Sequence, residues 1–199
     1  MLYPEFAKTL LALQAADLRL RDELIARGEL EGGYHPEMEA LHNANAERLS
    51  EMIDAIGYPT AGKVGEEASA AAWLVVQHAI SRPALMRRYR DLLQPTVKAG
   101  DASARRLAYL TDRIAVFSDA PQRYGTQFDW DENGRLSPNP VDDPEAVDAR
   151  RSALGMNTLG EQTRVIREQA AAENRRCPAD LTERRAQYDA WRRSVGWIN

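Results

Sequence analysis

The chain has 199 residues, of which 44% are hydrophobic and 28% charged, and its formal net charge at pH 7 is −4. This balance is that of a soluble globular protein and excludes disorder over the whole chain. A chain of this length closes around one hydrophobic core, so we expect a single domain over residues 1–199. The single cysteine, Cys177, excludes an internal disulfide.

The distribution of charge argues against a nucleic-acid partner. Arginines near the C-terminus alternate with acidic residues such as Glu183 and Asp189, so positive charge is diluted rather than clustered. No apolar run approaches a membrane-spanning length, and the N-terminus lacks the pattern of a signal peptide. We therefore expect a cytoplasmic protein that binds a small molecule or a peptide, with no nucleic acid and no membrane as partner. The sequence leaves a homo-oligomer open.

Two amphipathic helices are predicted at the start of the chain. Apolar residues recur at spacings of three and four over residues 5–30 and 36–56, which is the pattern of a helix with one buried face. In the first helix, Leu10 and Leu24 belong to the apolar stripe. Asp17 is assigned to the opposite, charged side.

A central buried helix is predicted from about residue 65 to 80, because this segment is apolar nearly all round. Further helices are expected over about 83–99 and 102–116, with a kink or early stop at Pro95. The expected core includes four residues of the third and fifth helices: Trp73, Leu74, Val76 and Leu110.

The pattern changes from helix to strand over residues 122–139. Polar and aromatic residues flank Asn133-Gly134, a pair that favours the positive φ angles of a tight hairpin turn. The sequence therefore predicts one β-hairpin between about residues 124 and 138.

Three more helices are predicted over about residues 144–153, 158–174 and 180–194. The last two are very polar and are expected on the surface. The predicted fold class is thus mainly α, a helical bundle-like single domain with one short β-hairpin. Its core block is about 36–155, and polar C-terminal helices occupy about 156–195.

Four blocks of the sequence are unusual in their content and order: VGEEASAAAWLVVQHA at 64–79, LAYLTDRI at 107–114, QRYGTQ at 122–127 and DPEAVDARR at 143–151. Together they resemble an uncharacterised bacterial domain family of unknown function, over about residues 40–160. The resemblance implies a bacterial origin and a shared site, but it implies no particular chemistry.

His78 is the first candidate for a catalytic residue, since it ends the apolar third helix. A neutral imidazole there could act as a general base, or it could be a buried histidine that is simply hydrogen-bonded. Glu67 lies about 16 Å from it along the helix axis, so the two cannot touch directly. We therefore expect an acidic partner from another element, with Asp112 as first candidate.

Asp112 and Arg113 lie in the fifth predicted helix among apolar neighbours. They form either a structural ion pair between helices or a functional pair, in which Asp112 orients His78 and Arg113 binds an anionic substrate group. Residues 122–127 carry a dense set of amide, phenol and hydroxyl groups. With Gly125 allowing close approach, they suit either a polar pocket or a hairpin edge pinned by side-chain hydrogen bonds.

The sequence offers no spacing typical of a metal or cofactor site. His35 and His42 are seven residues apart, and there is no His-x-x-x-His motif, cysteine pair or phosphate loop. No metal and no cofactor are therefore expected.

The functional hypothesis is a small bacterial enzyme that performs cofactor-independent acid–base chemistry, as a hydrolase or lyase, on a small molecule or peptide. The alternative is a non-catalytic ligand-binding or protein-interaction module. The expected catalytic residues are His78, Asp112 and Glu67. The expected substrate-binding residues are Glu66, Trp73, Gln77, Arg113, Arg123, Tyr124, Thr126 and Gln127.

Overall fold

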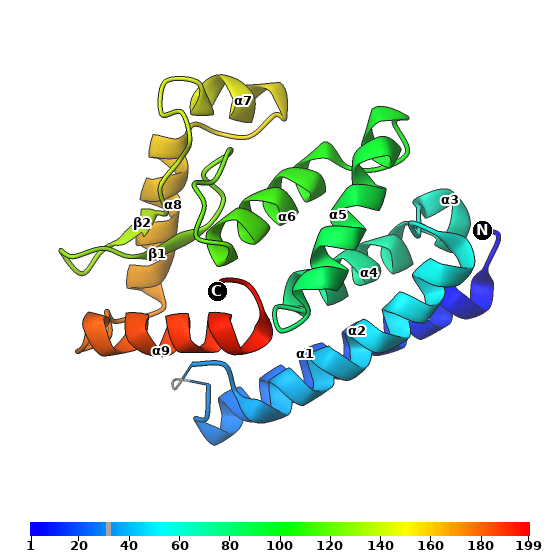
Figure 1. Ribbon diagram of the computed structural model, residues 1–199, viewed down its shortest axis with the longest axis horizontal. Coiled ribbons are helices and arrows are strands. Elements are labelled where there is room, and N and C mark those ends of the chain that lie inside the picture. Colours follow the sequence, from blue (N-terminus) through cyan, green and yellow to red (C-terminus); the bar gives the residue numbers. More distant parts are fainter. Residues whose placement is uncertain (31–32) are drawn as a thin grey trace. The chain divides into compact units, whose positions relative to one another are not determined.

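The computed structural model describes residues 1–30 and 33–199, and this part of the chain is mainly helical with one two-stranded antiparallel hairpin (Figure 1). The predicted fold class is confirmed. Each predicted helix corresponds to an observed helix, and its first and last residues differ from the observed bounds by at most three residues. The chain forms two compact units, residues 1–103 and 104–199.

The first unit is entirely helical in its described part. Its elements are α1 (Pro4–Arg27), α2 (Pro36–Ile56), α3 (Ala61–Val64), α4 (Glu66–His78) and α5 (Pro83–Lys98). The one-turn helix α3 was not predicted, because four residues are too few to show a helical period. Pro95 lies within α5, which continues past it to Lys98.

Helix α4 packs against both α1 and α2, which also contact each other. The contact is apolar because each helix contributes fully buried side chains, among them Leu10 and Leu24 of α1, Leu49 of α2, and Val75 and Val76 of α4. These three helices carry the candidate site described below.

Helix α4 is less completely covered than the sequence suggests. Val76 is fully buried, as predicted, and so is Leu110 in the second unit. Trp73 and Leu74 are only half-buried. The buried face of α4 therefore carries alanines together with Val75 and Val76, whereas Trp73 and Leu74 lie at its margin.

The second unit combines the remaining helices with the hairpin. Its elements are α6 (Ala104–Phe117), β1 (Phe128–Trp130), β2 (Leu136–Pro138), α7 (Val147–Ala153), α8 (Leu159–Ala172) and α9 (Leu181–Val195). Helix α8 contacts β2, and α7 contacts α8. Of the side chains on α8 and α9, only Ala170 and Arg192 are buried, so both helices are largely at the surface.

The hairpin lies where predicted, but its turn differs from the prediction. Trp130 pairs with Leu136, so five residues separate the strands. Gly134 has a φ of 68°, whereas Asn133 has no positive φ, which makes the predicted tight turn wrong. The physical reason is the Asp131 carboxylate, which accepts hydrogen bonds from the backbone N–H groups of Asn133 and Arg135, each at 2.9 Å.

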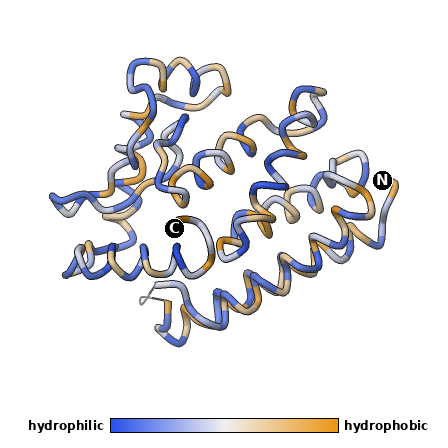
Figure 2. The backbone as a smooth tube through the Cα atoms, viewed as in Figure 1, coloured by the Kyte–Doolittle hydropathy of each residue, from blue (hydrophilic) through white to orange (hydrophobic). Residues whose placement is uncertain are grey.

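Hydrophilic positions recur along all the long helices (Figure 2). Within residues 1–30 and 33–199, no helix is long and apolar enough to cross a membrane.

Candidate functional site

Three titratable side chains meet inside the first unit. Asp17 lies in the middle of α1, His42 in the first half of α2, and His78 at the C-terminal end of α4. The Asp17 Oδ2 atom is 2.8 Å from His78 Nδ1 and 3.2 Å from His42 Nε2. We call these three residues the Asp17 cluster.

The cluster forms because all three helices turn the relevant positions toward one another. Asp17 is seven residues from both Leu10 and Leu24, so it shares their helix face, and all three are fully buried. His42 is likewise four residues after the buried Met38. The prediction that Asp17 lies on the charged side of the first helix was wrong.

Asp17 is a charged carboxylate in a buried position. Burial alone would raise the pKa of Asp17, but the nearby imidazoles of His42 and His78 outweigh it and hold that pKa well below its ordinary value. Its second oxygen, Oδ1, is buried and accepts no hydrogen bond from any residue in the described part of the chain.

A hydroxyl group orients the second imidazole. Tyr34 Oη is 2.7 Å from His42 Nδ1 and 3.5 Å from the backbone oxygen of His78. Burial and the negative charges of Glu39 and Asp17 raise the pKa of Tyr34 above its ordinary value, so the phenol stays neutral. Tyr34 therefore links the α2 and α4 sides of the cluster.

The three side chains of the cluster differ in their exposure to solvent. The side chain of Asp17 is 0% exposed and that of His42 8%, whereas that of His78 is 29% exposed. The cluster thus has a buried anionic base and a partly open imidazole edge. Such an arrangement can transfer a proton to or from a bound molecule, and its three potential ligand atoms lie close enough together to be considered as ligands of one metal ion.

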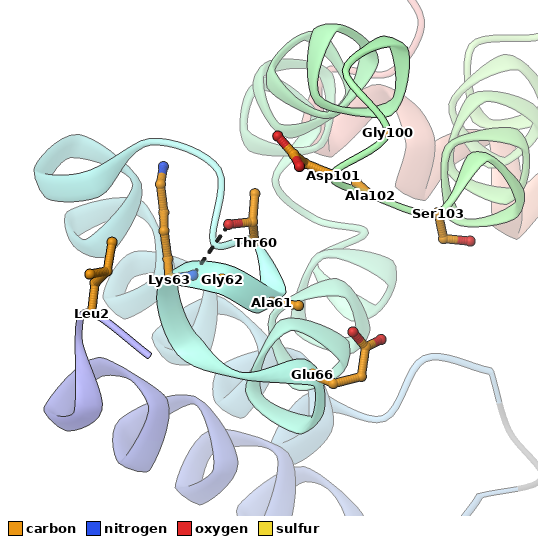
Figure 3. A pocket seen from close by; sticks show the side chains of 10 residues that line it. All are labelled: Leu2, Thr60, Ala61, Gly62, Lys63, Glu66, Gly100, Asp101, Ala102 and Ser103. Atoms are coloured by element: carbon orange, nitrogen blue, oxygen red, sulfur yellow. Dashed lines mark hydrogen bonds between the residues drawn. The ribbon is translucent and has the colours of Figure 1, made fainter.

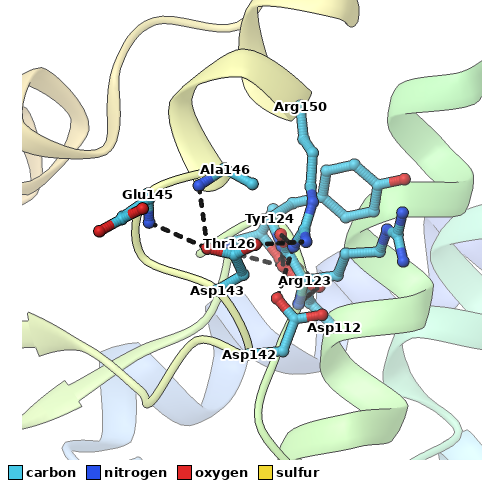
Figure 4. A network of polar contacts seen from close by, with 9 residues as sticks. All are labelled: Asp112, Arg123, Tyr124, Thr126, Asp142, Asp143, Glu145, Ala146 and Arg150. Carbon is cyan, nitrogen blue, oxygen red and sulfur yellow. Dashed lines mark hydrogen bonds and ion pairs between the residues drawn. The ribbon is translucent and has the colours of Figure 1, made fainter.

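Asp112 has a different set of partners from the one expected. Its carboxylate accepts hydrogen bonds from the backbone N–H groups of Arg123 (2.8 Å), Tyr124 (3.1 Å) and Thr126 (3.0 Å), and from Thr126 Oγ1 (3.0 Å), as Figure 4 shows. Burial raises the pKa of this carboxyl, while the bonds from Thr126 and Arg123 act in the opposite direction. The carboxylate in contact with His78 is Asp17.

The rest of the 122–127 segment is also fixed by hydrogen bonds. The buried Gln122 side chain donates to the backbone oxygens of Gln127 (3.0 Å) and Asn139 (2.8 Å). The buried Arg151 donates to the backbone oxygen of Tyr124 at 2.8 Å. The segment is an irregular loop wrapped around Asp112, not a strand with alternating faces. Side-chain hydrogen bonds therefore hold this loop, which precedes the hairpin, in one conformation.

Three of the predicted substrate-binding residues line one cavity of about 310 Å³ in the second unit. Arg113 Nε donates to Gln127 Oε1 at 3.2 Å, and Gln127 Nε2 donates to Thr126 Oγ1 at 3.0 Å. Burial lowers the pKa of Arg113. Phe128, on β1, adds apolar surface to this cavity.

The glutamates at the start of α4 are exposed and far from His78. Glu66 lines a separate cavity of about 680 Å³ (Figure 3) and, by helical rise, lies about 18 Å from His78 along α4. Lys63, in the same cavity, donates to the backbone oxygen of Ile56, the last residue of α2, and to that of Tyr58 at 3.0 Å. Glu67 is exposed, and Gln77 is buried.

The model of one protein family matches residues 4–174 of the chain. The chain belongs to DUF6624, a family of unknown function. This DUF6624 match is wider than the resemblance over residues 40–160 and includes Asp17, His42 and His78. No curated protein and no solved structure matches the chain.

Sequence reasoning missed Asp17 and His42 as members of the site in this DUF6624 chain. A signal for both was present, because each is a polar residue placed between apolar residues of the buried helix face. The sequence does not show that these residues meet His78. Asp17 and His78 are 61 residues apart, and only the packing of α1 against α4 joins them.

Proposed function

We propose that this DUF6624 protein is an enzyme that acts on a small molecule, in a hydrolysis or elimination that begins with removal of a proton at the Asp17 cluster. One observation carries the proposal. The buried carboxylate of Asp17 lies 2.8 Å from Nδ1 of a histidine whose side chain is 29% exposed.

The pairing assigns a role to each partner. Asp17, as a charged acceptor, holds the proton of neutral His78 on Nδ1, so the lone pair is on Nε2. Nε2 then accepts a proton from water or from the substrate, and the carboxylate stabilises the imidazolium that forms. Asp17 is the positioning residue and His78 the proton acceptor.

Non-catalytic ligand binding is the second candidate, and the second-unit cavity favours it. Arg113, Thr126 and Gln127 present a cation, a hydroxyl and an amide in fixed positions around a space of about 310 Å³. This volume is at the lower end of the range for small-molecule sites. In this case Arg113 and Gln127 would bind the ligand, and no reaction would follow.

The test is an activity screen followed by matched variants. The purified protein is assayed on a panel of small esters, amides, phosphoesters and hydroxy acids. For any substrate turned over, we expect His78→Gln and Asp17→Asn to lower kcat/KM by about 10²–10⁴-fold, because general base catalysis is worth about that much.

His35→Gln is the control, since His35 is the histidine outside the cluster and is half-buried. Wild-type rates in folded His78→Gln protein would contradict the proposal. Ligand binding without turnover, lost on Arg113→Gln, would favour the second candidate.

A further inference from the structure

We propose that the Asp17 cluster is a binding site for one divalent d-block metal ion, of the zinc or iron(II) class. Asp17 Oδ2, His42 Nε2 and His78 Nδ1 would be its ligands. The inference deepens the proposed function and rests on it for the chemistry, although binding of the metal can be measured on its own.

The two separations measured from Asp17 Oδ2 fit coordination. A metal bonded at about 2.0–2.1 Å to two ligands separates them by about 3 Å at a right angle and by about 3.4 Å at a tetrahedral angle. The separations from Asp17 Oδ2 are 2.8 Å to His78 and 3.2 Å to His42. Two imidazoles and one carboxylate are a donor set that suits d-block ions better than magnesium or calcium.

The hydrogen bonding leaves a place for a cation. The backbone oxygen of His78 can only accept, so Tyr34 Oη directs its proton to it and accepts from His42 Nδ1–H. In this tautomer the lone pair of His42 lies on Nε2, where a metal ion would bind, whereas the other tautomer places a proton on Nε2 that faces Asp17 in the metal-free protein. Nε2 is buried and makes no hydrogen bond of acceptable geometry within the described residues, although Asp17 Oδ2 is only 3.2 Å away.

The carboxylate of Asp17 provides independent support for a bound cation. Its Oδ1 atom is buried and accepts no hydrogen bond from the described chain, in a side chain that is 0% exposed. This oxygen and His42 Nε2 are therefore two buried polar atoms of one cluster that have no hydrogen-bond partner of good geometry among the described residues. A divalent ion bound to Asp17 Oδ2 and His42 Nε2 would place positive charge beside both the carboxylate and the imidazole lone pair.

The surroundings resemble the supporting contacts of metal sites. Metal-bound histidines usually donate their second ring N–H to an oxygen, which fixes the ring and its tautomer. His42 has this partner in Tyr34 at 2.7 Å. Because the three ligands come from the packed helices α1, α2 and α4, their positions are set before an ion binds.

Three protein ligands leave coordination positions open for water, and the partly exposed edge of His78 gives access. A bound water would release one proton to solvent, and the remaining hydroxide would attack the substrate or remove its proton. In the loaded protein this hydroxide would take the place of His78 Nε2 as the group that removes a proton, or it would attack the substrate directly.

Metal binding is tested on the full chain after removal of metal with a chelator. Titration with Zn²⁺ by calorimetry, and with Co²⁺ by its visible absorption, should give one ion per chain. We expect His78→Asn, His42→Gln and Asp17→Asn each to weaken binding by at least about 100-fold, and Tyr34→Phe by about 10-fold.

The matched control is His35→Asn, which changes the other group of residues with metal-ligand character, Glu29, His35 and Glu37. Its affinity should equal that of the wild type. Equal Zn²⁺ affinity in folded His78→Asn protein, or loss of binding only in His35→Asn, would overturn the site. Tyr34→Phe, which keeps all three ligands, provides the test if a ligand variant fails to fold.

Activity separates this inference from the proposed function. If no ion binds at the cluster, metal-free protein keeps full activity and His78→Gln abolishes it, the metal inference fails and the proposed function stands. If one ion binds at the cluster but no substrate on the panel is turned over, the metal site stands and the proposed function fails. Activity that returns only with added metal supports both.

Discussion

At the scale of single residues, the most unusual feature is a fully buried carboxylate on an amphipathic helix. An isolated charge in this position would cost several kcal/mol, so it must be compensated by its neighbours. The imidazoles of His42 and His78 supply this compensation and lower the pKa of Asp17. A group that packs apolar helices together would be served better by leucine, as Leu10 and Leu24 show on the same face. The buried charge is therefore the observation on which the proposed function rests.

The depressed pKa of Asp17 predicts how stability depends on pH. A carboxyl whose native pKa lies below its ordinary value of 3.8 stabilises the fold above that pH, and the contribution is lost as pH falls through the native pKa. We therefore expect metal-free Asp17→Asn to lose less stability than the wild type as pH drops below about 4. Urea unfolding at several pH values measures this. Parallel stability curves for the two proteins would contradict the assigned pKa.

Residue-scale reasoning from the sequence found His78 but not its partners. The polar interruptions at Asp17 and His42 are visible in the sequence once the helix faces are aligned on the buried leucines. Their meeting with His78 is set by long-range packing, which periodicity within one helix does not encode. Asp112 was found as a buried acid, and its partners turned out to be the backbone N–H groups of the 122–127 loop.

At the scale of elements, the 122–127 loop is the most constrained segment of the second unit. Asp112 and Gln122 hold its backbone from within, and Arg151 holds it from α7. Gly125 has a φ of 65°, and a Cβ atom there would lie 2.6 Å from Leu159 Cδ1. The glycine thus allows α8 to pack close to the loop, and the close approach predicted at this position is made by Leu159.

Replacement of this glycine separates backbone strain from packing. Gly100 also has a positive φ, of 81°, but a Cβ atom added there would have no neighbour within 4 Å among the described residues. Gly100→Ala should therefore cost about 1 kcal/mol of stability from strain, and Gly125→Ala about 2–4 kcal/mol, because Leu159 must also move. Thermal or urea unfolding of both variants gives the difference. Equal losses would show that the contact with Leu159 has no energetic weight.

Whether a helix could be predicted from the sequence depended on its length. Helices of two turns or more show their period, so their bounds were predictable within three residues. The four residues of α3 were not, and the hairpin turn was misjudged because the side chain of Asp131, rather than Asn133-Gly134, organises it. Local turn chemistry depends on which side chain captures the backbone donors, and several residues in that loop could do so.

At the scale of the whole molecule, the family match covers parts of both units, since it runs from residue 4 to 174. The first unit contains the complete Asp17 cluster, and the second contains the pinned loop and the cavity beside it. Mainly helical architecture could be predicted from composition and period. The location of the site could not, because it arises from three helices that are separated in the sequence and meet only in the folded unit.

X-ray absorption of the Zn²⁺-loaded protein tests the central claim most directly, because it identifies the ligands around the ion. The account predicts nitrogen and oxygen neighbours at about 2.0–2.2 Å, with the outer-shell scattering of two imidazole rings. In His78→Asn one ring should be lost. A sulfur neighbour at about 2.3 Å, which would have to come from Cys177, or a shell without imidazole scattering, would contradict the assignment of Asp17, His42 and His78 as the functional centre.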